Sequence, residues 1–94
     1  MFFQHIITQP YGVNCYIIAD EKTKEGAVID PGGSSEEILE VIQSNHLQIK
    51  YIILTHYHFD HIIAVPQIKN ITGAQIVIHA ADSAGLQDLS LIHI

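Results

Sequence analysis

Arginine and tryptophan are absent from this sequence of 94 residues, and four lysines stand against ten acidic residues. The formal charge of −6 at pH 7 leaves no basic surface for the phosphates of nucleic acid or for anionic lipid. We therefore expect neither nucleic acid nor a membrane as a partner. A small-molecule substrate is the expected ligand.

Cysteine is also scarce, because Cys15 is the only one in the chain. One thiol cannot form a disulfide within the chain, which is typical of a reducing compartment. Apolar runs such as residues 51–54 are short, whereas a membrane span needs roughly 20 apolar residues. Residues 1–9 lack the basic segment that begins a secretory signal. Together these absences predict a cytoplasmic protein.

Hydrophobic residues make up 48% of the chain, which favours one small folded domain over a disordered tail. β-Branched and aromatic residues predict strands at 2–8, 13–19, 27–29, 49–54 and 74–79. Helices are expected from Ser34 or Ser35 to about Asn45, at 66–71 between Pro66 and Gly73, and at 80–87. This order indicates an α/β fold with catalytic groups on loops at one end of the strands.

Two local patterns give finer expectations. Ser34 or Ser35 precedes two glutamates and an apolar face, so its side chain is expected to cap the helix that follows. Residues 49–54 are nearly all apolar, which predicts a strand covered on both faces.

Histidine is the residue in excess: there are seven, three of them between residues 56 and 61. His56 and His58 point to the same side of an extended or looped segment, so they can bind one metal ion. Asp60 and His61 follow directly and can turn toward a second ion. Nitrogen and oxygen donors without thiolate suit zinc, and also iron or manganese. The competing interpretation is a histidine-rich surface turn of solvated side chains.

Residues 55–61 (THYHFDH) resemble the T-H-x-H-x-D-H signature of the metallo-β-lactamase superfamily of metal-dependent hydrolases. Three further segments fall in that family's order. Residues 14–16 (NCY) resemble its N-x-Y segment, 27–33 (AVIDPGG) its strand and D-P-G turn, and 76–79 the strand after the motif helix. Within the superfamily the chain looks most like glyoxalase II-like (hydroxyacylglutathione hydrolase-like) proteins, whose assigned activity is thioester hydrolysis.

The resemblance implies an α/β fold in which residues 1–88 form the N-terminal half of an αββα sandwich, so the sandwich is incomplete. Family members have a second, similar half that supplies the remaining metal ligands, and this chain alone is expected to be inactive. In the complete enzyme one or two zinc ions, or iron, would be bound, and a metal-bound hydroxide would attack the thioester carbonyl. The family also gives Asp60 the task of orienting that hydroxide, which makes it the expected catalytic residue.

Asp30 matches the aspartate of the family's D-P-G turn, where it lies close to the metal loop and holds the loop by hydrogen bonds behind the ligands. Asp before Pro-Gly is also ordinary turn chemistry, so both interpretations stand.

The remaining candidates are weaker. Cys15 lies between apolar strand residues and is expected to be a small buried side chain rather than a nucleophile. No function is assigned to His5 or His46, and His79 is expected to be a packed or partly exposed imidazole rather than a ligand.

Two rival functions share the same residues. A mononuclear iron dioxygenase acting on persulfides uses the same ligand run, and a non-catalytic metal-binding module would need no further ligands. A further His, a bridging Asp and a last His in a longer reading frame would favour the enzyme.

Residues 89–94 (LSLIHI) match the translation of the end sequence of a transposase adapter used in preparing sequencing libraries. We therefore expect this hexapeptide to be non-native and His93 to have no role as a metal ligand. A native amphiphilic tail is the alternative.

Overall fold

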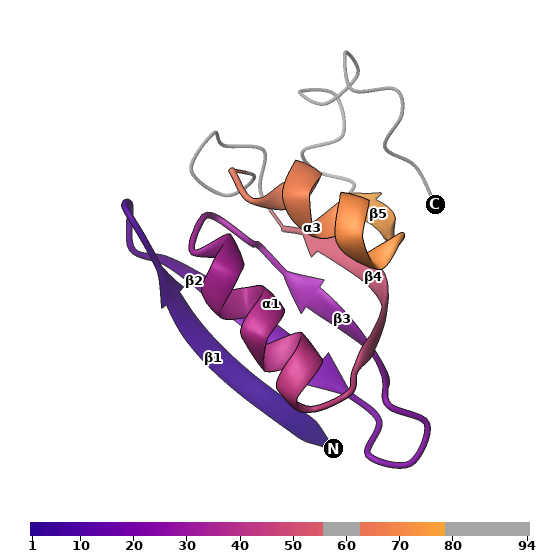
Figure 1. Cartoon of the computed structure of the whole chain (residues 1–94). Helices are drawn as coiled ribbons and strands as arrows, with labels where there is room; N and C mark the ends of the chain where they lie inside the picture. The colour runs from indigo at the N-terminus through magenta and orange to yellow at the C-terminus, as the bar shows by residue number, and fades with distance from the viewer. Residues whose placement is uncertain (56–62, 79–94) are drawn as a thin grey trace.

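The computed structural model of the chain describes residues 1–55 and 63–78. Its elements in chain order are β1 (Phe2–Thr8), β2 (Val13–Ala19), β3 (Glu25–Ile29), α1 (Ser35–Ser44), β4 (Gln48–Leu54), α3 (Val65–Thr72) and β5 (Gln75–Ile78) (Figure 1). The predicted order of strands and helices is confirmed. The predicted helix at 80–87 and the boundary between 1–88 and 89–94 lie outside the described residues and stay predictions.

The strands form one sheet in the order β1-β2-β3-β4-β5. The first three strands are antiparallel neighbours, whereas β3, β4 and β5 run parallel and are joined by α1 and α3. Since β1 and β3 both pair antiparallel with β2, β1 runs in the same direction as the three parallel strands. The carboxyl ends of β1, β3, β4 and β5 therefore share one end of the sheet, the end from which residues 56–62 follow β4.

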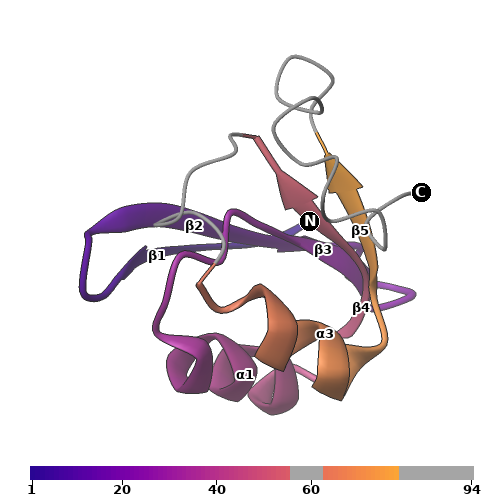
Figure 2. The same ribbon diagram turned by 90° about the horizontal axis from the view of Figure 1, so that it is seen from above.

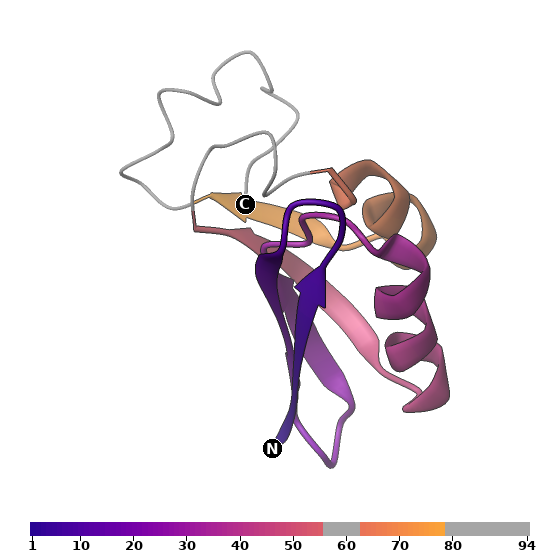
Figure 3. The same cartoon turned by 90° about the vertical axis from the view of Figure 1, so that its left-hand side faces the viewer.

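Both helices cover the same face of the sheet (Figures 2 and 3). Ile17, Val28 and Ile52 are register partners on neighbouring strands, and all three are fully buried beneath the helices. Ile38 of α1 and Ile68 of α3 are fully buried in the same core. Each such side chain stabilises the fold by roughly 1.5–3 kcal/mol relative to an exposed one.

The opposite face of the sheet carries large exposed apolar side chains. Phe3 and Ile7 of β1 are 57% exposed, and Tyr51 of β4 is 43% exposed. The prediction that residues 49–54 are covered on both faces is therefore wrong, because both helices of the described part lie on one side. A sheet with one covered face is what an incomplete sandwich requires.

The N-cap of α1 is at Ser34, one of the two predicted positions, but its side chain does not cap the helix. The helix begins at Ser35 with Ser34 at the N-cap position, but Ser34 has a left-handed backbone, φ 48°, and makes no capping hydrogen bond with its side chain. Its hydroxyl oxygen instead accepts a hydrogen bond from the backbone N–H of Gln9, 2.8 Å away. The hydroxyl is used to join α1 to the turn between β1 and β2.

Within the described ranges, α1 and α3 have ten and eight residues, so neither helix is long enough to cross a bilayer.

Candidate metal centre

The four predicted metal ligands, which are His56, His58, Asp60 and His61, lie outside the described residues, and their roles stay predictions. Within residues 1–55 and 63–78, no group of three or more His, Cys, Asp or Glu side chains is arranged to hold a metal ion. The described structure instead shows how the residues on each side of this histidine segment, residues 56–62, are attached to the fold.

Asp30, directly after β3, is bonded to the residue that precedes the histidine segment. One carboxylate oxygen accepts the backbone N–H of Thr55 at 2.8 Å, and the other accepts a short hydrogen bond from the Thr55 hydroxyl. The Asp30 N–H donates to the carbonyl of Ile53 at 2.9 Å, so the backbone pairing of β3 with β4 continues into this contact. Asp30 is 6% exposed and has φ 54°, a conformation that aspartate tolerates better than most residues.

Pro31 is bonded to a residue that follows the histidine segment. Its carbonyl accepts the backbone N–H of Ala64 at 3.0 Å, just before α3 begins at Val65. The two flanks of the histidine segment are thus bonded to two consecutive residues, Asp30 and Pro31. Thr55 and Ala64, the described residues before and after the segment, are thereby both attached to the turn that follows β3.

The next residues of this turn connect it to two more elements. Ser35 donates its hydroxyl hydrogen to the side-chain oxygen of Gln67 at 2.7 Å, which ties the first turn of α1 to the first turn of α3. Gly33 lies so close to the turn after β1 that a Cβ built on it would be 1.9 Å from the carbonyl oxygen of Gln9. Sequence reasoning did not find the contacts of Gln67 and Gln9. The pair Gly32-Gly33 was the only signal of a close backbone approach.

Cys15 behaves as the sequence predicts. It is fully buried in β2, and burial, followed by the charges of Asp30 and Glu37, raises the pKa of its thiol to about 12. The raised pKa favours the protonated thiol near neutral pH, which agrees with the interpretation of Cys15 as a small buried side chain.

The described histidines outside the segment are engaged elsewhere. The His5 ring stacks on Tyr16 with centroids 4.8 Å apart, and its Nε2 lies 2.8 Å from the side-chain oxygen of Asn14. His46 is exposed beyond the end of α1, with its N–H bonded to the carbonyl of Gln43. His79 and His93 lie outside the described residues.

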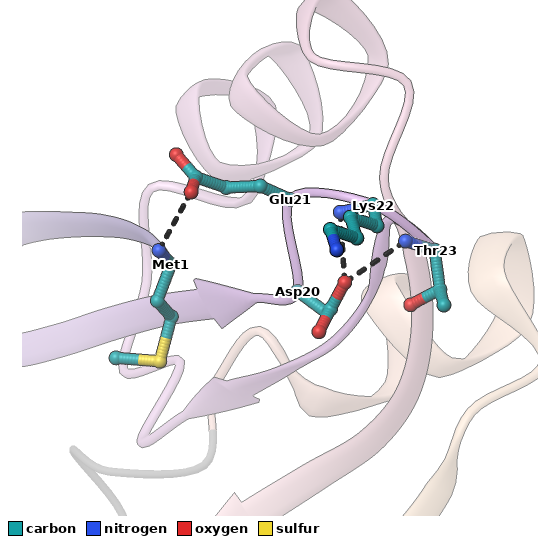
Figure 4. Close-up of polar contacts among 5 residues, drawn as sticks. All are labelled: Met1, Asp20, Glu21, Lys22 and Thr23. Carbon is teal, nitrogen blue, oxygen red and sulfur yellow. Dashed lines mark hydrogen bonds and ion pairs between the residues drawn. The ribbon is translucent and has the colours of Figure 1, made fainter.

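Polar contacts at the opposite end of the sheet are those of an exposed turn (Figure 4). One Asp20 carboxylate oxygen accepts the backbone N–H groups of Lys22 and Thr23 at 2.7 and 2.9 Å, and these bonds lower the pKa of Asp20 below its usual range. The N-terminal amine of Met1 contacts Glu21 at 2.8 Å. None of these residues borders Asp30 or Thr55, so the turn stabilises the fold away from the candidate centre.

Comparison with known proteins points in the same direction. A family model described as "Metallo-beta-lactamase superfamily" matches residues 8–93. The hydroxyacylglutathione hydrolase GloC of Haemophilus influenzae is 41% identical over 63 residues, which are 67% of this chain and 29% of that protein.

Two solved structures share the fold. BLEG-1, a B3 metallo-beta-lactamase, has a TM-score of 0.78 and 31% identity, with 85% of this chain and 38% of that protein covered. TTHA1623, solved in a di-iron-bound form, has a TM-score of 0.75 and 28% identity, with 94% of this chain and 43% of that protein covered. The chain spans less than half the length of the curated relatives it matches and corresponds to the N-terminal part of their fold.

Proposed function

Because this chain belongs to the metallo-β-lactamase superfamily, we propose that the protein is a metal-dependent hydrolase that cleaves a thioester of the hydroxyacylglutathione type. The observation that carries the proposal is the attachment of Thr55 and Ala64, which flank the histidine segment, to Asp30 and Pro31. A surface turn of solvated histidines would not need a buried carboxylate such as Asp30 bonded to the residue that precedes it. The similarity to a hydroxyacylglutathione hydrolase supports the substrate class.

The donor set fits a metal ion. His56, His58, Asp60 and His61 offer nitrogen and oxygen atoms, and the single cysteine is buried and protonated, so no thiolate competes within the described residues. Zinc is the proposed metal. Iron is the alternative, and TTHA1623 was solved in a di-iron-bound form. When bound, the metal supplies a Lewis acid for the substrate carbonyl and lowers the pKa of a water molecule.

Asp30, Pro31 and Asp60 have different proposed roles in this site. The Asp30 carboxylate fixes the backbone and the hydroxyl of Thr55, which directly precedes His56, and the Pro31 carbonyl fixes the backbone after the segment. We assign to Asp60 the orientation of the attacking water, because a carboxylate accepts the hydrogen bond of a water held beside it.

The experiment uses the complete gene product, purified and analysed for zinc and iron. The rate of hydrolysis of a hydroxyacylglutathione thioester is measured from the decrease in the absorbance of the thioester. The variant His58→Ala should lose most of its bound metal and at least about 100-fold of its hydrolysis rate, since one donor of the set is removed.

His46→Ala is the matched control, because it removes an exposed imidazole at the end of α1. It should keep both the metal and the rate. Unchanged metal content and turnover in His58→Ala would show that the assignment is wrong.

The second candidate is a mononuclear iron dioxygenase acting on persulfides, and the fold similarity to ETHE1 from Myxococcus xanthus, with a TM-score of 0.65 and 28% identity, is consistent with it. Oxygen uptake with glutathione persulfide, measured on the same preparation, distinguishes it from a thioester hydrolase. Metal bound without either activity would identify a non-catalytic metal-binding module.

A further inference from the structure

We propose that β1 is a docking surface for a second copy of this chain, and that the two β1 strands pair antiparallel about a twofold axis at His5. The inference goes beyond the proposed function and does not depend on it, since β1 carries none of the predicted metal ligands.

β1 lies at one edge of the described sheet (Figure 1). Of the two edge strands there, β1 has seven residues and β5 has four. All seven residues of β1 pair with β2 in one register without a shift, so the strand is regular along its whole length. Such an edge presents backbone N–H and C=O groups that can pair with another strand.

Edge strands are commonly blocked by lysine, proline or a bulge, and β1 (FFQHIIT) contains none of these. Four of its side chains are exposed, those of Phe3, Gln4, His5 and Ile7. The His5 ring is stacked on Tyr16 of β2, its register partner, so it is held toward the neighbouring strand rather than over the outer edge. Within the described part of the chain, this edge is therefore open and unprotected.

The charge of the chain favours this strand as a contact between copies. Two copies, each with a formal charge of −6, repel one another wherever their acidic residues meet. The described acidic residues lie between Asp20 and Glu25, at Asp30 and in α1, whereas β1 has no charged side chain. Pairing along β1 therefore places no acidic residue in the paired strands.

The length of β1 fixes the register. Two copies of Phe2–Thr8 pair over all seven residues only when His5, the middle residue, lies opposite His5 of the second copy. Phe3 then lies opposite Ile7 of the second copy, and Ile7 lies opposite its Phe3. Both side chains are 57% exposed in the single chain, and an aromatic residue opposite a β-branched one is a favourable cross-strand pair. The contact is thus self-complementary, as a twofold interface requires.

The test uses the full 94-residue chain with Cys15→Ala, so that each cysteine variant carries one thiol. Directly opposite residues of an antiparallel pair have Cα atoms about 4.5–5.5 Å apart, a separation that a disulfide can span. Under mild oxidation, His5→Cys should therefore form a disulfide-linked dimer at least about tenfold faster than Tyr51→Cys. Tyr51 is 43% exposed on β4 and reports contact between the open faces of two sheets instead.

A mixture of Phe3→Cys and Ile7→Cys chains measures the register, and it replaces the first measurement if His5→Cys does not fold. The mixed dimer should form at least about tenfold faster than either dimer of like chains, because only the mixed pair lies opposite. Circular dichroism checks that each variant keeps its sheet.

Sedimentation equilibrium measures the same contact without oxidation. Gln4→Lys places a charge on the edge strand and should raise the dissociation constant of the dimer at least about tenfold. Gln43→Lys is the matched control, since it makes the same change at an exposed position of α1, and its dissociation constant should stay within about twofold.

A chain that stays monomeric throughout the concentration series would overturn the inference. Cross-linking of Tyr51→Cys as fast as that of His5→Cys would overturn it in favour of contact between the open faces. Like-chain dimers that form as fast as the mixed dimer, or an unchanged dissociation constant in Gln4→Lys, would also overturn it. Thioester hydrolysis by the complete gene product bears only on the proposed function, so either proposal can fail while the other stands.

Discussion

Asp30 and Thr55 are separated by 25 residues in the chain and joined by two hydrogen bonds, one to each oxygen of the carboxylate. The contact crosses from the end of β3 to the end of β4 and is partly buried. Since Thr55 precedes the first candidate ligand, His56, the carboxylate fixes the conformation from which the histidine segment starts.

We expect Asp30→Ala to weaken metal binding by about 10- to 100-fold, because residues that orient ligands from behind have effects of this size. The free energy of unfolding should fall by about 3 kcal/mol, since two donors of Thr55 lose their charged acceptor. Metal titration and urea unfolding of the complete gene product measure the two effects.

Asp20→Asn is the matched control for this prediction. Asp20 also accepts two backbone N–H groups, but in an exposed turn at the opposite end of the sheet. It should leave metal binding unchanged. Unaltered metal affinity in Asp30→Ala would refute the proposed role of the carboxylate.

Gly33→Ala should destabilise the protein by about 2–4 kcal/mol, because the added Cβ would lie 1.9 Å from the Gln9 carbonyl oxygen and one backbone must move. Gly12→Ala, in the hairpin turn against which Gly33 packs, is the control. Gly12 has φ 70° with open space around the added Cβ, so only the backbone penalty of about 1 kcal/mol remains. Equal unfolding midpoints in denaturant for the two variants would show that Gly33 is not packed against the turn.

The pKa of Cys15 predicts a specific dependence of stability on pH. The folded state holds the thiol protonated up to about pH 12, whereas its ordinary pKa is 9.0, so the unfolded chain loses the proton first. The contribution of Cys15 to stability is therefore complete below pH 9.0 and declines as the pH rises from 9.0 toward 12. A Cys15→Ala variant should lack this component when unfolding is compared between pH 8 and pH 10.5.

Thiol labelling gives an independent reading of the same residue. A disulfide reagent added at pH 8 should modify Cys15 only as fast as the protein opens, and at once after denaturation, because the thiol is fully buried. Rapid labelling of the native protein would contradict the burial of this side chain.

The sequence predicted the strands well where side chains alternate between two environments. In β2, Val13, Cys15 and Ile17 are buried while Asn14 is exposed, and this period of two marks the strand. For β4 the strand was predicted correctly from its apolar run, but the expected coverage of both faces was wrong, because Tyr51 and Ile53 face the side without helices. An apolar run shows only that both faces of a strand could be buried. It does not show whether a helix or another sheet packs on each face.

Contacts that depend on which loops meet were not predictable from the sequence. Hydrogen bonding of Asp30 to the metal loop was expected only through a family resemblance, with ordinary turn chemistry as an equal alternative, and Thr55 was not identified as its partner. Ser34 was expected to cap α1, but the left-handed backbone turns its hydroxyl toward Gln9. Which N–H group donates to the serine hydroxyl depends on a residue far away in the sequence, here Gln9. Nothing in the sequence around Ser34 identifies that residue.

The open face of the sheet makes a final prediction about the 94-residue chain expressed by itself. Phe3, Ile7 and Tyr51 expose large apolar side chains on three sites of one face, and such a surface binds hydrophobic dyes and promotes self-association. The chain should therefore increase the fluorescence of an anilinonaphthalene dye and sediment as concentration-dependent oligomers. Replacing these three residues with threonine, which keeps the preference for a strand, should remove most of the dye signal without loss of the sheet, because none of them is in the buried core. Tyr11→Thr and Ile71→Thr together form the control, since both positions are also more than half exposed but lie outside the strands.

A monomeric chain that binds no dye would show that this face is covered in solution. If the control pair lowered the dye signal as much as the triple variant, the apolar side chains of the strands would not be its cause.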